Sequence, residues 1–285
     1  MPLDLLPADL RLLALVATGV LGASLGSFLN VCIARWPAEG SVVRPRSRCP
    51  RCARGIAWHE NIPVLSWLLL GGKCRGCRLP ISLQYPAVEL LVAAGWLASV
   101  WAFGAGLEAA RVAVFGTLLL GVAVTDARHY LIPDGYTVTG LLVGMGGAVA
   151  QLFTGEVTRF AGPWEAVLGA CVGAGAITII GWLAEVVLKR EAMGFGDSTL
   201  MAMVGAALGP ERALLTIFAG AFVGAVTFLV VVAPVGWLRA RRRGEAFAFP
   251  EVPFGVFLAP AALLVLLWGT PLITWYLNRT FPEPV

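Results

Sequence analysis

Long apolar stretches separated by short polar ones run along most of the chain. Seven of them approach or exceed the roughly 20 residues that a helix needs to cross a membrane. They cover residues 12–34, 88–103, 112–125, 136–153, 164–188, 213–238 and 254–277. An eighth stretch, 198–209, would cover only about 18 Å as a helix, and we expect it to span in a short form rather than as a re-entrant half-helix. The pattern therefore predicts an all-α polytopic membrane protein with about eight transmembrane helices.

One longer polar segment, residues 35–86, interrupts this pattern after the first apolar stretch. We therefore expect a first transmembrane helix (1–34), a small insert outside the membrane (35–86) and a multi-helix membrane domain (87–285). The composition agrees, because 58% of the residues are hydrophobic and 13% are charged, whereas soluble domains carry about 25% charged residues. The first stretch is too long for the core of a cleavable signal, so we expect it to remain as a membrane helix.

The positions of the basic residues predict how the chain lies in the membrane. With the N-terminus outside and eight spans, sixteen of the 21 Lys and Arg residues fall on the cytoplasmic side, many of them in the insert. The reverse orientation inverts this ratio and opposes the usual excess of Lys and Arg in cytoplasmic loops. The insert therefore faces the cytoplasm, where anionic lipid headgroups can contact its arginines. No segment has the pattern of a nucleic-acid-binding module, and the oligomeric state does not follow from the sequence.

Small residues four positions apart occur within two of the apolar stretches, at Gly140 with Gly144 and at Gly169 with Gly173. This spacing lets two membrane helices approach each other closely. It predicts tight helix packing and is not specific to any function.

Four cysteines of the insert form two Cys-x-x-Cys pairs with 21 residues between the pairs. They are Cys49, Cys52, Cys74 and Cys77. Two such pairs can place four thiolates around Zn²⁺, and a site with four protein ligands is structural rather than catalytic. Disulfides are not expected in a reducing compartment, and free thiols or a redox pair are the alternative. We expect Cys32 and Cys171, inside apolar stretches, to serve packing.

Two acidic residues lie at the ends of apolar stretches that the predicted topology brings to the same cytoplasmic edge. Asp126 ends the third stretch, and Asp197 precedes the short eighth one, where it follows Gly194 and Gly196. Ionisable groups at membrane depth are costly and mark functional sites. Of two close carboxylates, one can activate water while the other protonates the leaving group. The two glycines would let an extended peptide approach the backbone.

Each of these acids also has a plainer interpretation. Asp197 can cap the helix that follows it, and Asp126 can be a solvated end residue. Asp134, directly after Pro133, is typical of a turn or a helix start, and we rank it behind the other two as a supporting residue. Glu89, inside the second stretch, serves either a buried hydrogen bond or a substrate contact. From the spacing alone, the catalytic and the plain interpretations stay equally open.

Several short blocks stand in a fixed order along nearly the whole chain. They are Gly26-Ser27-Phe28-Leu29-Asn30-Val31 with Arg35-Trp36-Pro37, the two cysteine pairs, Glu60-Asn61-Ile62-Pro63-Val64-Leu65-Ser66-Trp67, Pro80-Ile81-Ser82 with Tyr85-Pro86-Ala87-Val88-Glu89, Asp126 with Ile132-Pro133-Asp134, Gly194-Phe195-Gly196-Asp197, and Pro253-Phe254-Gly255. In this order they resemble the blocks of bacterial type IV prepilin peptidases. One departure is Gln84, where many members have Arg before Tyr-Pro; it lies away from the aspartate blocks.

The resemblance implies an aspartyl endopeptidase of the GxGD type, the class that includes presenilin, in the inner (cytoplasmic) membrane of a bacterium. Asp126 and Asp197 match its catalytic pair. Its substrates are prepilins and the pseudopilins of type II secretion, cut at the cytoplasmic face after a glycine that ends a short basic leader. Members with the cysteine-bearing insert commonly also methylate the new N-terminal amine with S-adenosylmethionine.

Methylation is implied by the resemblance alone. The insert has no glycine-rich βαβ pattern that would cradle a nucleotide-like cofactor, so no residue is assigned to S-adenosylmethionine. One alternative is a peptidase without methylation, in which the insert is a structural or substrate-docking module. Another is an ion-coupled transporter, because acids and glycine-broken helices also mark ion pathways. Carriers, however, place such acids near the midplane rather than at helix ends.

Overall fold

The computed structural model describes residues 7–155, 158–189, 193–244, 246 and 252–280. Within these ranges the protein is built from helices, and two isolated bridges in the insert are its only β-type pairings. The chain divides into two compact units, Met1–Gly121 and Val122–Val285. The division falls inside α4 (Leu107–His129), so the insert belongs to the same unit as the helices before and after it.

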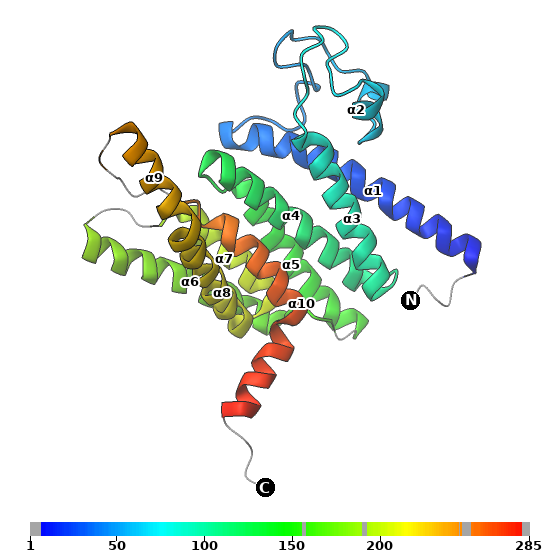
Figure 1. Cartoon of the computed structure of the whole chain (residues 1–285). Coiled ribbons are helices and arrows are strands. Elements are labelled where there is room, and N and C mark those ends of the chain that lie inside the picture. Colours follow the sequence, from blue (N-terminus) through cyan, green and yellow to red (C-terminus); the bar gives the residue numbers. More distant parts are fainter. Residues whose placement is uncertain (1–6, 156–157, 190–192, 245, 247–251, 281–285) are drawn as a thin grey trace. The chain divides into compact units, whose positions relative to one another are not determined.

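The first unit is a pair of long helices with the insert at one end. Helices α1 (Ala8–Arg35) and α3 (Gln84–Phe103) lie side by side (Figure 1). At Gly26 an added Cβ would lie 2.7 Å from the Cα of Glu89, so only glycine allows this approach. The insert contains three short helical segments. They are η2 (Trp36–Ala38), η3 (Trp58–Glu60) and α2 (Leu65–Leu69).

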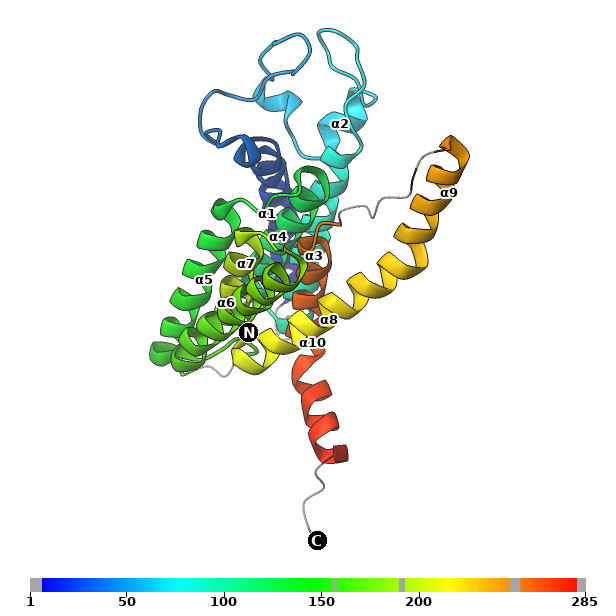
Figure 2. The same cartoon turned by 90° about the vertical axis from the view of Figure 1, so that its left-hand side faces the viewer.

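The second unit holds the end of α4 and the helices that follow it. They are α5 (Asp134–Thr154), α6 (Pro163–Leu188), α7 (Phe195–Leu208), α8 (Pro210–Thr227), the π-helical turn η4 (Phe228–Val232), α9 (Ala233–Arg243) and α10 (Gly255–Thr280). Helices α8 and α9 continue into each other through η4 as one long helix that bends along its length (Figure 2). Gly209, with a φ of 86°, is the single residue between α7 and α8. Its backbone conformation is one that glycine adopts readily.

Helix α7 lies at the centre of the second unit. It packs against α5, α6, α8 and α10, and most of its residues are buried. Its contact with α6 is backbone to backbone: a Cβ on Gly169 would lie 2.8 Å from the carbonyl carbons of Gly205 and Gly209, and a Cβ on Gly173 would collide with the carbonyl of Met201. The close packing predicted from the Gly169–Gly173 spacing is therefore confirmed.

Seven helical segments in the described ranges are long and apolar enough to cross a membrane, and α7 is a shorter apolar helix beside them. This confirms the predicted all-α membrane fold. The second and third apolar stretches form longer helices than their hydropathy predicts, because the polar residues at their ends continue the helix. Pro86 fits because it lies in the first turn of α3, and Arg128 and His129 suit the last turn of α4. Helix α7 begins before the predicted residue 198, which places Asp197 inside its first turn.

Candidate functional site

The two Cys-x-x-Cys segments fold into loops of the same geometry. In each loop the first cysteine donates its N–H to the carbonyl five residues later, from Cys49 to Arg54 and from Cys74 to Leu79. In each, the residue four positions after the first cysteine has a positive φ and donates back to that cysteine's carbonyl. The isolated bridges Arg48–Gly55 and Lys73–Pro80 also occupy equivalent positions. We call these two loops the cysteine knuckles.

The knuckles bring their four sulfur atoms together. All four Sγ atoms lie within 4.8 Å of one another, with Cys49 to Cys77 at 3.9 Å and Cys52 to Cys74 at 4.0 Å. Four thiolates about 2.3 Å from a tetrahedral Zn²⁺ lie about 3.8 Å apart, so the observed spacing fits that ion. The N–H groups of Cys52 and then Arg51 lower the pKa of the Cys49 thiol to about 6 from its usual 9.0, which favours the thiolate. Cys32 and Cys171 lie on α1 and α6, outside the cluster.

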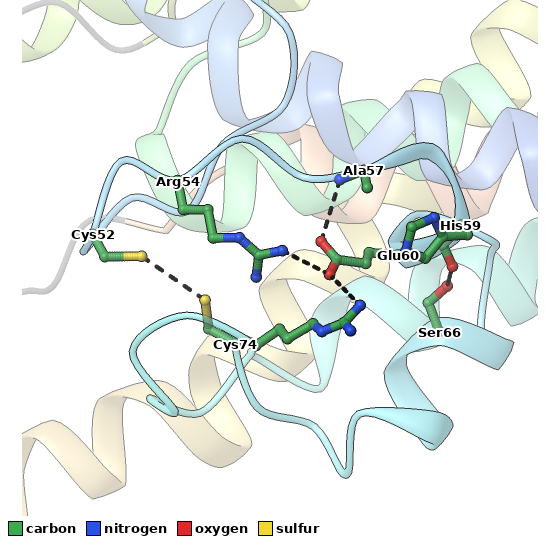
Figure 3. Close-up of polar contacts among 8 residues, drawn as sticks. Cys52, Arg54, Ala57, His59, Glu60, Ser66 and Cys74 are labelled. Carbon is green, nitrogen blue, oxygen red and sulfur yellow. Dashed lines mark hydrogen bonds and ion pairs between the residues drawn. The ribbon is translucent and has the colours of Figure 1, made fainter.

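Glu60 joins the two knuckles through a single carboxylate (Figure 3). Its Oε1 accepts hydrogen bonds from Arg54, which follows the first pair, at 2.9 Å, and from Arg75, inside the second pair, at 3.1 Å. Its Oε2 accepts the N–H of Ala57 at 3.2 Å. The Ala57 N–H first, and then the two guanidinium groups, lower the pKa of the Glu60 carboxyl. Sequence reasoning missed this role, although Glu60 stands at the head of one of the blocks.

Glu89 makes the buried hydrogen bond that the sequence left as one of its two options. It lies on α3, and its Oε2 accepts the N–H of Val64 at 2.7 Å. Val64 has a φ of 61°, which is rare for a β-branched residue. The carboxylate therefore holds the residue before α2 against the side of α3. Glu89 belongs to the first unit, whereas Asp126 and Asp197 belong to the second.

Asp126 and Asp197 are both buried in the second unit, at 5% and 9% exposure. Their carboxylates are close enough to interact electrostatically. Asp126 lies in the last turn of α4, and Asp197 is the third residue of α7. Neither plain interpretation fits, because Asp126 is not solvated, and Gly194 rather than Asp197 is the N-cap residue of α7. Asp134, in contrast, is an exposed residue in the first turn of α5.

The segments around the two aspartates meet at Ile132, in the loop between α4 and α5. A Cβ on Gly196 would lie 3.0 Å from the Cβ of Ile132, and a Cβ on Gly255 would lie 2.9 Å from its Cδ1 and 2.8 Å from Asp126 Oδ2. Three blocks that are distant in sequence therefore converge here. Gly194 is exposed and extended before α7.

The start of α10 completes the surroundings of Asp126. The backbone N–H groups of Gly255 and Val256 face its carboxylate. The Oδ2 atom is buried and makes no hydrogen bond with the part of the chain that the structure describes. A buried carboxylate oxygen without a partner is costly, and a catalytic role is one of the reasons for which a native structure keeps such an atom. In the sequence, the contact between the start of α10 and Asp126 corresponds to the last block, Pro253-Phe254-Gly255. The pattern of that block alone does not reveal this role.

A pair of hydroxyl groups lies next to each aspartate. Thr125, directly before Asp126, lies 3.2 Å from the hydroxyl of the buried Tyr136. Ser198, directly after Asp197, lies 3.1 Å from the hydroxyl of Thr178 on α6. Because Thr178 donates its own proton to a carbonyl of α6, Ser198 is the donor in the second pair. These pairs tie the helix turns that carry the carboxylates to neighbouring helices.

Comparison with known proteins finds relatives along most of the chain. Residues 20–103 match the bacterial peptidase A24 N-terminal domain, and residues 113–229 match the type IV leader peptidase family. The chain is 36% identical over 286 residues to the prepilin leader peptidase/N-methyltransferase of Xanthomonas campestris pv. campestris, covering 92% of this chain and 94% of that protein. A protein of the same name from Pseudomonas aeruginosa is 34% identical over 288 residues, covering 92% and 93%.

A relative of the same name from Myxococcus xanthus is 42% identical over 226 residues. That match covers 79% of this chain but only 65% of the relative. No solved structure matches the chain.

Proposed function

The chain belongs to the type IV leader peptidase family, and we propose that it is a membrane aspartyl endopeptidase. Its substrates are type IV prepilins and the pseudopilins of type II secretion, and it cuts after the glycine that ends their basic leader. The observation that carries this proposal is the pair of buried, interacting carboxylates of Asp126 and Asp197 at the convergence of three sequence blocks. The family also sets aside the ion-coupled transporter.

The chemistry follows from how the two carboxylates share their surroundings. Two close carboxylates do not both ionise easily, so one holds a proton while the other is charged. The charged one takes a proton from a water that attacks the scissile carbonyl, and the protonated one gives a proton to the leaving amide nitrogen. Asp126 faces the backbone N–H groups at the start of α10, and Asp197 lies in the first turn of α7, so the N–H groups of a helix start are near each carboxylate.

The glycines next to the aspartates give the substrate access to them. Gly194 carries no side chain and precedes α7 in an extended conformation, so a peptide strand can approach the backbone there. Gly196 instead presses on Ile132 and keeps the first turn of α7 close to the α4–α5 loop. We infer that Gly194 borders the path of the leader and that Gly196 positions Asp197.

We place the site and the insert on the cytoplasmic side of the inner membrane. The support is the excess of Lys and Arg in the segments that share this side, including the insert and the end of α9. A pilin leader is basic and soluble, whereas the helix that follows it is apolar. Cleavage at the membrane edge therefore matches the boundary between these two parts of the substrate.

The four knuckle cysteines fit a structural Zn²⁺, which would supply folding free energy to an insert too small for its own core. Cys49, Cys52, Cys74 and Cys77 would hold it, and four protein ligands leave no open position for catalysis. Metal analysis of the purified protein should find about one zinc per chain. A protein that folds and cleaves with no zinc would contradict this assignment.

Methylation of the new N-terminus with S-adenosylmethionine is the second half of the proposed function. It is supported by the name that the relatives carry. Mass spectrometry of the processed pilin, with S-adenosylmethionine present, distinguishes the two forms of the proposal. A product heavier by one methyl group supports the bifunctional enzyme, and an unmodified product reduces the function to the peptidase.

The peptidase is tested by replacing each carboxylate with its isosteric amide. Asp126→Asn and Asp197→Asn should each abolish prepilin cleavage while the protein keeps its fold and its zinc, because each removes one proton-transfer group. Glu211→Gln, an exposed residue of α8, is the matched control and should cleave normally. Near-normal cleavage by either aspartate variant would show that the pair is not catalytic.

A further inference from the structure

Helix α2 of the insert has two different faces. Its inner face carries Ser66, whose hydroxyl accepts the N–H of Ile62 at 2.8 Å and donates to the carbonyl of His59 at 3.0 Å. The outer face carries three leucines at helical spacing. Leu65, Leu68 and Leu69 are 48%, 61% and 76% exposed. Since residues three and four apart lie on the same side of a helix, they form one apolar surface, which we call the leucine face.

Two hydrogen bonds hold α2 in place, one to the helix α3 and one to the segment just before α3. The Val64 N–H, just before α2, binds Glu89, the sixth residue of α3. At 1.5 Å per residue this point is about 7 Å along a helix that is a candidate span. The Trp67 ring N–H, from α2 itself, donates to the carbonyl of Ile81 at 3.2 Å. The start of α2 is therefore tied to the first turns of a candidate transmembrane helix.

We propose that the leucine face is a membrane-binding surface, by which the insert rests in the boundary between lipid headgroups and acyl chains. A short helix at this depth with an apolar outer face suits that layer. On α3 itself, Leu90 and Leu91 are also exposed.

The residues beside α2 match the same partner. Lys73, a few residues after α2, is exposed, and a basic side chain near the bilayer is attracted to anionic headgroups. Trp58, exposed in η3, is of a residue type enriched at membrane surfaces. The cysteine knuckles are thereby held against the bilayer instead of swinging freely. This inference does not depend on the peptidase activity.

Spin labelling of the zinc-loaded full chain in lipid nanodiscs tests the proposal. A nitroxide amino acid, introduced by codon suppression so that the cysteines stay intact, replaces Leu69 and, in a second variant, Leu68. The nanodiscs contain phosphatidylethanolamine and phosphatidylglycerol. Accessibility to oxygen, which partitions into lipid, is compared with accessibility to a water-soluble nickel chelate. Leu90 serves as the lipid-facing reference and exposed Arg51 as the aqueous one.

Labels at both leucine positions should give an oxygen-to-nickel accessibility ratio that approaches the ratio at Leu90 and is several-fold above that at Arg51. A ratio equal to that at Arg51 would overturn the proposal, because the face would then lie in water. Low accessibility to both reagents would also overturn it, since the face would then be covered by protein. Zinc content equal to that of the unlabelled chain shows that a label has not disturbed the knuckles.

Discussion

Replacing Gly255 by alanine tests whether the start of α10 packs directly on Asp126. The new Cβ would lie 2.8 Å from Asp126 Oδ2 and 2.9 Å from Ile132 Cδ1. Ordinary contacts of a Cβ are 3.4–4 Å, so both side chains have to move by roughly 0.5 Å or more. The substitution therefore displaces the carboxylate without removing any catalytic group.

Gly255→Ala should change the stability of the protein little and its rate of catalysis much more. The colliding atoms are side-chain ends, whose rotation costs about 0.5–1.5 kcal/mol, and alanine recovers about 0.4–1 kcal/mol because it restricts the unfolded chain more than glycine does. The net change in stability is therefore within about 1 kcal/mol, or about 4 °C in melting temperature. A misplacement of about 1 Å can lower a rate about 100-fold, so we expect Gly255→Ala to lower kcat about 10-fold or more.

The assay is steady-state cleavage of a purified prepilin, with thermal unfolding measured on the same samples. Gly175→Ala on α6 is the matched control, because no atom lies within 4 Å of its added Cβ, and it should retain both kcat and melting temperature. If Gly255→Ala cleaved as fast as this control, the close contact between α10 and Asp126 would be wrong. A large fall in melting temperature would show that Gly255 acts on the fold rather than on the carboxylate.

Three further results are expected. Glu60→Gln should weaken zinc binding a few-fold in a chelator competition, because it removes the charge that pairs with Arg54 and Arg75 across the knuckles. Glu39→Gln, an exposed glutamate of the same insert, should bind zinc normally, and equal affinities would refute the link between the knuckles. Removal of zinc by a chelator should unfold the insert and make all four knuckle cysteines react with an alkylating agent; cysteines that stay protected in the zinc-free protein would contradict this. Gly169→Ala should destabilise the fold by about 1–3 kcal/mol through overpacking. A melting curve that matches that of the Gly175→Ala control would disprove this expectation.

The sequence predicted those features that depend on local spacing. The two Cys-x-x-Cys pairs predicted the cysteine cluster, because two ligands separated by two residues lie on one tight turn. Gly169 and Gly173 foretold the close approach of α6, because the absence of a side chain is itself the geometric requirement. The same-side placement of Asp126 and Asp197 came from counting charges between apolar stretches.

The contacts that complete the sites were not predictable in this way. Glu60 meets Arg54 and Arg75 only after both knuckles have folded, so no single segment encodes that contact. Ile132 and Gly255 reach the aspartates from distant parts of the chain, and a hydropathy pattern does not record such distances. The lengths of α3 and α4 were underestimated for another reason, since their end turns carry polar residues that hydropathy counts as loop.

The short helix α7 has a consequence for how the enzyme responds to its membrane. Its 14 residues reach about 21 Å, less than the hydrocarbon core of a bilayer, and a lipid-exposed helix of that length would thin the membrane or tilt its neighbours. The sides of α7 are covered by α5, α6, α8 and α10. Its length therefore has to fit the surrounding helices and not the thickness of the bilayer. Hydrophobic mismatch therefore acts on the outer helices alone, and Asp197 keeps its depth in membranes of different thickness.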